Sequence, residues 1–162
     1  MTTPEEVRWL TADPRAQLVG LLSVAELLPA ALDSQLRRDA NLTHFDYQVL
    51  AMLSEASGRA LRMTTLAQRT SATLPRLSHV VERLEARGLV ARTPDADDAR
   101  ATRAGLTELG WQTLVAAAPG HVATARALVI DALTDEQVAQ LERITGALLG
   151  RLDPEDRLAR RG

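Results

Sequence analysis

Residues 70–90, TSATLPRLSHVVERLEARGLV, constrain the fold more than any other stretch, because they combine a helical repeat with a start and a stop signal. The apolar repeat has the three- and four-residue spacing of one buried stripe on an α-helix. Its members are Leu77, Val80, Val81 and Leu84. Thr73 can cap the first turn, Pro75 stands where a missing N–H costs nothing, and Gly88 can end the helix in a left-handed conformation.

The opposite face of this predicted helix is narrow, polar and lightly basic. It carries Pro75, Arg76, Ser78, His79, Glu82 and Arg83. A major groove accepts one helix, and arginine can donate two hydrogen bonds to guanine there. An ordinary solvated helix surface has a similar composition, so the helix taken alone leaves both interpretations open.

Periodic patterns predict two further helices before this one. A long amphipathic helix is expected over about 13–39, with a bend near Pro29. A second helix follows, with Thr43 and Asp46 as a capping box, and it should stop near Ser57-Gly58. A short third helix capped by Thr64 or Thr65 then precedes the turn RTSAT.

The segments after Gly88 predict a hairpin and two more helices. LVART and ATRAGLT have the alternation of two short strands joined by the polar loop PDADDAR. A fifth helix starts at Thr107 and is expected to break at Pro119-Gly120, and a sixth begins at a capping box of Thr134 and Gln137.

This order of elements predicts a mainly α fold with a small antiparallel β-hairpin wing. It is the order of a winged helix-turn-helix with N- and C-terminal dimerisation helices, because the apolar stripes of the end helices can be buried only against each other or a second copy. We expect a helical dimerisation region at 13–40 and 107–152, a winged helix-turn-helix DNA-binding region at 41–106, and tails at 1–12 and 153–162.

Charge is distributed unevenly along the chain. The 19 basic residues are all arginine and the formal net charge is -2. Residues 1–58 have a net charge of -4, residues 59–103 of +4 and residues 104–162 of -2. The basic third contains the predicted helix-turn-helix and wing, so the acidic average does not exclude a polyanionic partner.

The loop PDADDAR has residue types suited to the minor groove of DNA. An arginine at a hairpin tip can enter that groove, where the potential is most negative, and a nearby acid can hold it extended. Arg100 and Asp98 are the candidates. A solvated loop with an incidental ion pair is the alternative, whereas a calcium loop is excluded because Arg100 and Leu106 occupy the required glycine and glutamate positions.

In these residues the chain resembles the MarR family of transcription regulators. The matching pieces are LTHFDYQVLAMLSE, TTLAQRTSATLPRLSHVVERLEARGLVAR and DDARATRAGLTELG. The resemblance implies a homodimer of interlocking end helices, with residues 73–87 in the major groove of a pseudo-palindromic operator. It also implies that Arg100 enters the minor groove and that Asp98 orients it. The predicted DNA contacts are Thr73, Pro75, Arg76, Ser78, His79, Arg83, Asp98 and Arg100.

The same resemblance implies a small lipophilic or phenolic effector bound between the dimerisation helices and the DNA-binding lobe. The candidate lining residues are His44, Phe45, Tyr47 and Trp111, although rings at such helical spacings are more often plain core. Without cysteine there is no thiol sensor, and the three histidines are too far apart in sequence to predict a metal site. No motif for catalysis or a cofactor is present, so an enzyme is not expected.

The sequence therefore predicts a cytoplasmic, dimeric regulator of transcription that binds double-stranded DNA. Repression, relieved by a small molecule, is the expected output. The amino terminus has no signal-peptide pattern, and no uninterrupted apolar run reaches about 18 residues, the minimum for a membrane span. The alternative is a winged-helix protein-interaction scaffold without operator binding.

Overall fold

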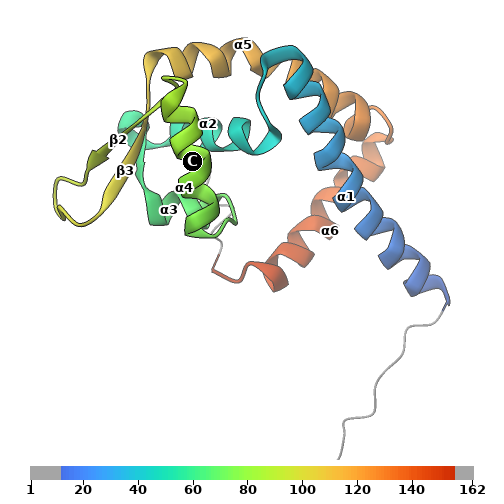
Figure 1. Ribbon diagram of the computed structural model, residues 1–162. Helices are drawn as coiled ribbons and strands as arrows, with labels where there is room; N and C mark the ends of the chain where they lie inside the picture. The colour runs from blue at the N-terminus through green and yellow to red at the C-terminus, as the bar shows by residue number, and fades with distance from the viewer. Residues whose placement is uncertain (1–11, 156–162) are drawn as a thin grey trace, which may run out of the picture.

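The computed structural model describes residues 12–155 and has a winged lobe joined to long helices (Figure 1). Its helices are α1 Ala12–Ala40, α2 His44–Glu55, α3 Met63–Arg69, α4 Leu74–Ala86, α5 Glu108–Ala125 and α6 Asp135–Leu152, with the short turns η1 Ser57–Arg59 and η2 Arg126–Ile130. Its strands are β1 Ala60–Arg62, β2 Val90–Pro94 and β3 Thr102–Leu106. The predicted order of six helices and a hairpin is confirmed.

The sheet has three strands rather than the two of the predicted hairpin. The order is β1-β3-β2 and all pairs are antiparallel, with Ala91 opposite Gly105 and Leu61 opposite Ala104. β1 was missed because it is only three residues long and is half-buried throughout, so it shows no alternation. It follows a tight turn in which Gly58 has a φ of 65°.

The core of the lobe lies between α2, α3, α4 and the sheet, with α5 packed beside them. The predicted stripe of α4 is confirmed, because all four of its apolar residues are buried. The core also contains Leu36, Leu42, Leu50, Leu53, Leu66, Val90 and Leu114. Gly110 lies where α5 presses on the sheet: a Cβ there would be 2.0 Å from the carbonyl oxygen of Leu89.

Helix ends agree with most of the predicted capping residues. The Thr43 and Asp46 capping box is present, Thr73 caps α4, and Gly88 has a φ of 72° after that helix. The cap predicted for α3 is wrong. That helix begins at Met63, and Arg62 stands at its N-cap without a capping side chain, because the chain passes directly from β1 into the helix.

The break predicted at Pro119-Gly120 is also wrong, since α5 continues to Ala125. α1 packs across α5 at this point, and the Gln35 side chain lies 3.4 Å from where a Cβ of Gly120 would be. Packing between helices overrides the weak local propensity. The irregularity comes later, in the π-helical turn η2, where Asp131 N–H donates to the Arg126 carbonyl at 2.9 Å. α1 includes Pro29 without interruption, and the bend expected there stays a prediction.

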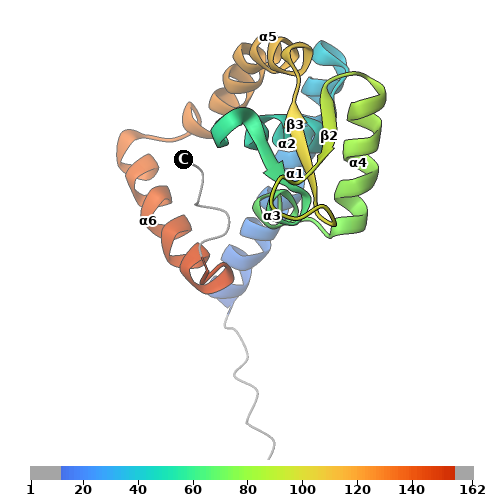
Figure 2. The same cartoon turned by 90° about the vertical axis from the view of Figure 1, so that its left-hand side faces the viewer.

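The long helices leave large apolar surfaces uncovered. The first half of α1 extends away from the winged lobe (Figure 2), whereas the end of α6 borders a hollow beside the turn between α3 and α4. Exposed apolar side chains on these elements and on the end of α5 include Leu18, Leu21, Leu22, Leu27, Val122, Ile144, Leu148 and Leu152. The apolar stripes expected at the two ends of the chain are therefore not buried against each other within one copy.

Two of these stretches are long and apolar enough on average to cross a membrane, Asp13–Ala40 and Glu108–Ile130. The sequence prediction considered only uninterrupted apolar runs and missed them. In the most apolar 18 residues of each stretch, only 6% are buried in the first and 11% in the second. Length and composition are weak evidence for a membrane span, and an amphipathic helix that lacks its packing partner passes the same test.

Candidate nucleic-acid interface

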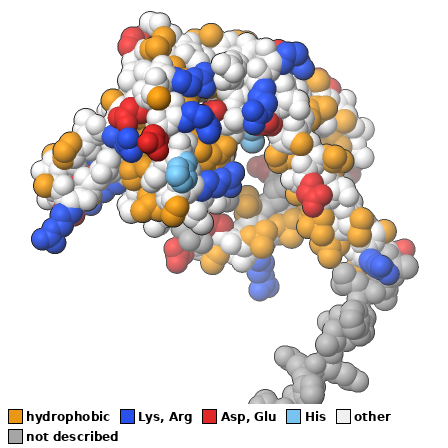
Figure 3. Space-filling view, viewed as in Figure 1, with side chains coloured by type: hydrophobic (Ala, Val, Ile, Leu, Met, Phe, Trp, Pro, Cys, Tyr) orange, Lys and Arg blue, Asp and Glu red, His pale blue; other side chains and the backbone are white. Residues whose placement is uncertain are grey.

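The outer face of α4 is open along its length. Pro75, Arg76 and His79 are exposed, and Ser78 is half-buried beside them. Thr73 begins this face, where its Oγ1 accepts the Arg76 N–H at 3.4 Å. Figure 3 shows basic side chains over this side of the molecule, with acidic groups among them. The structure thus presents the predicted α4 residues at one surface.

Two arginines of α4 are held by the first turn of α2. The Arg76 guanidinium lies over the Phe45 ring, 4.5 Å from its centroid. Arg83 Nη2 donates to Asp46 Oδ1 at 2.5 Å, and the Asp46 side chain is only 2% exposed. Both arginines therefore have fixed positions at the edge of α4.

Asp46 connects two parts of this surface, the start of α2 and the side of α4. Its carboxylate accepts the Thr43 N–H at 2.9 Å, completing the capping box of α2, and accepts from Arg83 as well. Sequence spacing indicated the cap but not the ion pair, because no local rule joins residues 37 positions apart.

Asp95 holds the base of the wing together. It is buried, and Arg62 of β1 donates to both its oxygens, at 2.9 Å and 2.6 Å. Arg103 of β3 donates at 3.2 Å and the Asp97 N–H at 3.1 Å. The Arg62 hydrogen bonds hold the pKa of Asp95 far below its ordinary value, with the Asp97 amide and Arg103 adding to the effect against the cost of burial.

Sequence reasoning missed Asp95 as a site residue, since it treated PDADDAR as one polar loop. The predicted acid, Asp98, is exposed and accepts the backbone N–H of Arg100 at 3.0 Å. Asp98 therefore shapes the turn that carries Arg100. Its role in orienting the guanidinium of Arg100 stays a prediction.

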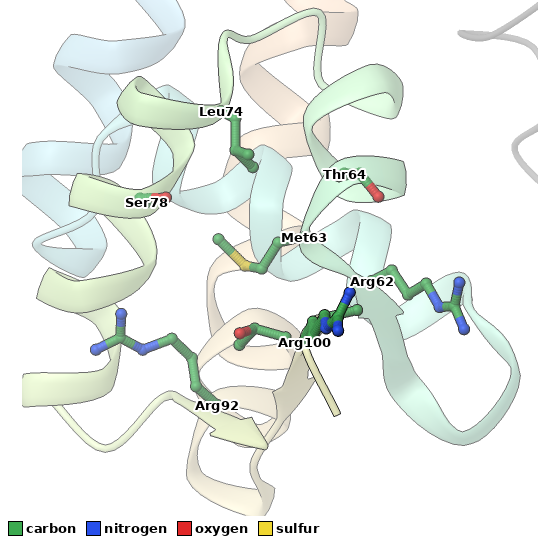
Figure 4. Close-up of a pocket in the computed structure, with 9 residues that line it drawn as sticks. Arg62, Met63, Thr64, Leu74, Ser78, Arg92 and Arg100 are labelled. Atoms are coloured by element: carbon green, nitrogen blue, oxygen red, sulfur yellow. The ribbon is translucent and has the colours of Figure 1, made fainter. Parts of the chain in front are cut away.

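A hollow of about 260 Å³ separates α4 from the wing (Figure 4). Arg100, Arg92 and Arg62 contribute to its lining, with Leu74 and Ser78 on the α4 side. We call it the wing-side hollow. Arg92 was not a predicted site residue; its backbone N–H and Nε both donate to Glu85 of α4, at 2.9 Å and 2.7 Å, which fixes β2 against the helix.

The four residues predicted to line an effector cleft do not come together. His44 and Tyr47 lie beside His121 of α5, with ring centroids 5.8 Å and 4.2 Å from that of His121. Phe45 faces Arg76 instead, and Trp111 stacks under Arg59 at 4.1 Å. The assignment of His44 and Tyr47 to an effector site stays a prediction.

The histidine pair sits in a weakly solvated environment between α1, α2 and α5. His44 Nδ1 is buried and has no hydrogen-bond partner among residues 12–155. His121 Nδ1 lies 3.4 Å from Gln35 Oε1. Burial lowers the pKa of both histidines, and their mutual repulsion lowers that of His121 further. Within the described part of the chain no group of three or more potential metal ligands occurs.

Comparison with known proteins places this geometry in a family. The MarR family model matches residues 40–101. Sco3205, a MarR family transcriptional regulator from Streptomyces coelicolor crystallised in complex with DNA, superposes with a TM-score of 0.88. It is 41% identical over 94% of this chain and 95% of that chain. AbsC, another MarR family regulator from Streptomyces coelicolor, has a TM-score of 0.84 and 36% identity over 90% and 98% of the two chains.

A more distant neighbour shares the fold alone. It is an organohalide-sensing transcriptional regulator with 2,4-dichlorophenol bound, with a TM-score of 0.75 and 23% identity over 92% of this chain and 86% of that chain. A comparison with curated proteins found no match. The identity to Sco3205 and AbsC over nearly their whole lengths shows that this chain belongs to the MarR family of transcriptional regulators.

Proposed function

We propose that this regulator binds a pseudo-palindromic DNA operator as a homodimer through α4 and the wing. The exposed face of α4 carries the proposal. Arg76 and His79 are exposed there, with Ser78 half-buried beside them, while the opposite face of the helix is buried in the core. Thr73 and Pro75 begin that face, and Asp98 and Arg100 extend it through the wing. Sco3205, which is 41% identical, was crystallised in complex with DNA.

The homodimer is supported by the uncovered apolar side chains of α1, α5 and α6. Leu27 is 69% exposed and Leu152 is 77% exposed, and they belong to a larger group of exposed apolar side chains than scattered single residues would give. A second copy would cover them by a two-fold contact. Two α4 helices related in this way would read two half-sites on one face of a duplex.

The proposed output is repression in the cytoplasm, because a dimer covering an operator excludes other proteins from the same DNA. We further propose that a small lipophilic or phenolic effector releases the DNA. The organohalide sensor with the same fold was crystallised with 2,4-dichlorophenol. Here the rings of His44 and Tyr47, at the junction of the dimerisation helices and the lobe, are the proposed contact residues.

Selection of duplexes from a random pool with the purified protein tests this function. Recovery of an inverted repeat is expected, with affinity falling roughly 10³-fold or more between 50 and 200 mM salt if six or more phosphates are contacted. A scaffold without operator binding would recover no sequence and would not shift any duplex. Repeating the binding assay with chlorinated phenols tests the effector, whose addition should lower the affinity for the recovered repeat.

A further inference from the structure

A second basic hollow lies on the other side of α4, at the corner where α1, α2 and α4 meet. Its volume is about 370 Å³, and Arg37, Arg83 and Arg87 contribute to its lining together with the chain at Asn41 and Thr43. We call it the α2-side hollow. Neither Arg37 nor Arg87 is among the residues predicted to contact DNA, and the α2-side hollow has no part in the proposed function so far.

The two hollows lie on opposite flanks of α4. At about 100° per residue, Arg83 and Arg87 share one line along the helix, whereas Leu74 and Ser78 of the wing-side hollow lie about 180° away from them. The outward direction between these flanks is occupied by Pro75, His79 and Glu82. A helix in a major groove about 12 Å wide has a phosphate backbone on each side. The two flanks of α4 therefore match the two strands that border the groove.

The charges of the α2-side hollow suit one phosphate. Arg37 is paired with Asp33 at 2.5 Å and Arg83 with Asp46 at 2.5 Å. The Arg87 side chain has no ion-pair partner among residues 12–155. Three guanidinium groups and two carboxylates leave a net charge of +1, and a guanidinium has five N–H donors, so the paired arginines keep donors for an anion.

The partners of these arginines also fix their positions. The Arg37 and Arg83 side chains remain 62% and 50% exposed while one of their nitrogens is held by a carboxylate. A pre-positioned guanidinium loses little freedom on binding, which favours a defined contact over a diffuse attraction.

We propose that the α2-side hollow seats a phosphate of the DNA strand on the far side of the groove from the wing, through Arg37, Arg83 and Arg87. The inference rests on the proposed operator binding and deepens it. It assigns Arg83 to the backbone rather than to a base edge. Base reading is left to Arg76, near the start of α4, and to the outward residues Pro75, His79 and Glu82. Each dimer would have two such seats.

The test uses the full-length protein, a selected operator duplex and a duplex of the same length with scrambled sequence. Arg87→Ala should weaken binding to both duplexes by the same factor, about eightfold per seat at 0.1 M salt, and lower the salt slope by about 0.9 per seat. Arg83→Lys should keep the sequence preference, since a phosphate accepts a point charge whereas bidentate guanine recognition needs arginine. Arg59→Ala is the matched control and should change neither quantity, because Arg59 contacts Trp111 of α5 and lines neither hollow.

The outcomes separate the seat from the proposed function. If the unmodified protein binds no duplex, operator binding fails and the seat fails with it. If it binds with a steep salt slope but Arg37→Ala and Arg87→Ala keep its affinity and slope, the seat alone is wrong. A loss confined to the selected operator in Arg83→Lys would show base reading instead. Ethylation of phosphates before binding should identify one phosphate in each half-site whose modification weakens binding of the unmodified protein but not of Arg87→Ala.

Discussion

Truncation of one exposed leucine on α1 should measure the homodimer directly. Leu22 lies in the first half of α1 and is 54% exposed. Leu22→Ala removes three carbon atoms, worth about 2.4 kcal/mol in full burial at about 0.8 kcal/mol each. Since only the exposed fraction can be gained on association, each copy loses about 1.3 kcal/mol and the dimer about 2.6 kcal/mol. The dissociation constant should rise by about 70-fold.

Leu109→Ala is the matched control for this measurement. Leu109 is 53% exposed and also helical, but it lies in the first turn of α5 beside the lobe. Both substitutions replace leucine by a good helix former, so neither should unfold its helix. Sedimentation velocity over a range of concentrations should show a weakened dimer for Leu22→Ala and the original dimer for Leu109→Ala.

Two results would refute the reasoning about the interface. One is a single copy of the unmodified protein at every concentration. The other is an equal dissociation constant for the unmodified chain and Leu22→Ala, because the exposed apolar face would then contribute nothing to association. A dimer weakened only by Leu109→Ala would place the contact at the other end of α5.

Three further predictions follow from particular contacts. Arg76→Ala should weaken operator binding by about 1–3 kcal/mol. Arg100→Ala should also weaken it, with less change in the preference for bases read in the major groove. Unchanged affinity of both variants in gel-shift titrations would contradict the placement of these arginines. Gly110→Ala should lower the free energy of unfolding by about 3 kcal/mol or more, because its Cβ would overlap a backbone carbonyl that cannot move aside; urea unfolding checks this. The lowered pKa values of His44 and His121 mean that the unfolded chain binds these protons first, so stability should hold above pH 6.5 and fall as the pH drops below it. Urea unfolding at pH 7.5 and 5.5 should show that loss, and a double substitution of both histidines by glutamine should reduce it.

The parts of the fold that could be predicted are those fixed by local pattern. The α4 stripe repeats at helical spacing, and the capping threonines stand three residues before a matching backbone or side-chain partner. Each of these features depends on residues within four positions of one another. Their positions in the structure therefore follow from the chain alone.

Errors arose where distant contacts override local preference. Pro119 and Gly120 disfavour a helix, yet α5 continues because α1 packs against it. β1 consists of three residues without alternation and exists because β3 offers an edge to pair with. Neither outcome is visible in a short window of sequence, since the deciding partner lies far away along the chain.

The candidate site shows the same division between local and distant information. The outward residues of α4 could be predicted, because a helical wheel places them once the buried face is known. The acids that hold the arginines could not be, since Asp46 meets Arg83 and Asp95 meets Arg62 across separations of 37 and 33 residues. Phe45 was predicted as an effector contact because it is a ring near two others, whereas its ring supports Arg76.

These ion pairs explain how a chain of net charge -2 can present a surface suited to a polyanion. Three acids near α4 are paired with arginines, whereas Glu82 is exposed on its outward face. Asp46 holds Arg83, Asp95 holds Arg62, and Glu85 holds Arg92, each through a guanidinium that borders one of the two hollows. A carboxylate paired with an arginine reduces the long-range attraction of that arginine for DNA. It also fixes the direction in which the remaining N–H donors of the guanidinium point. The total charge of the chain therefore says little about this surface. The contribution of each arginine to DNA binding depends on the acid that holds it and on the flank of α4 where it lies.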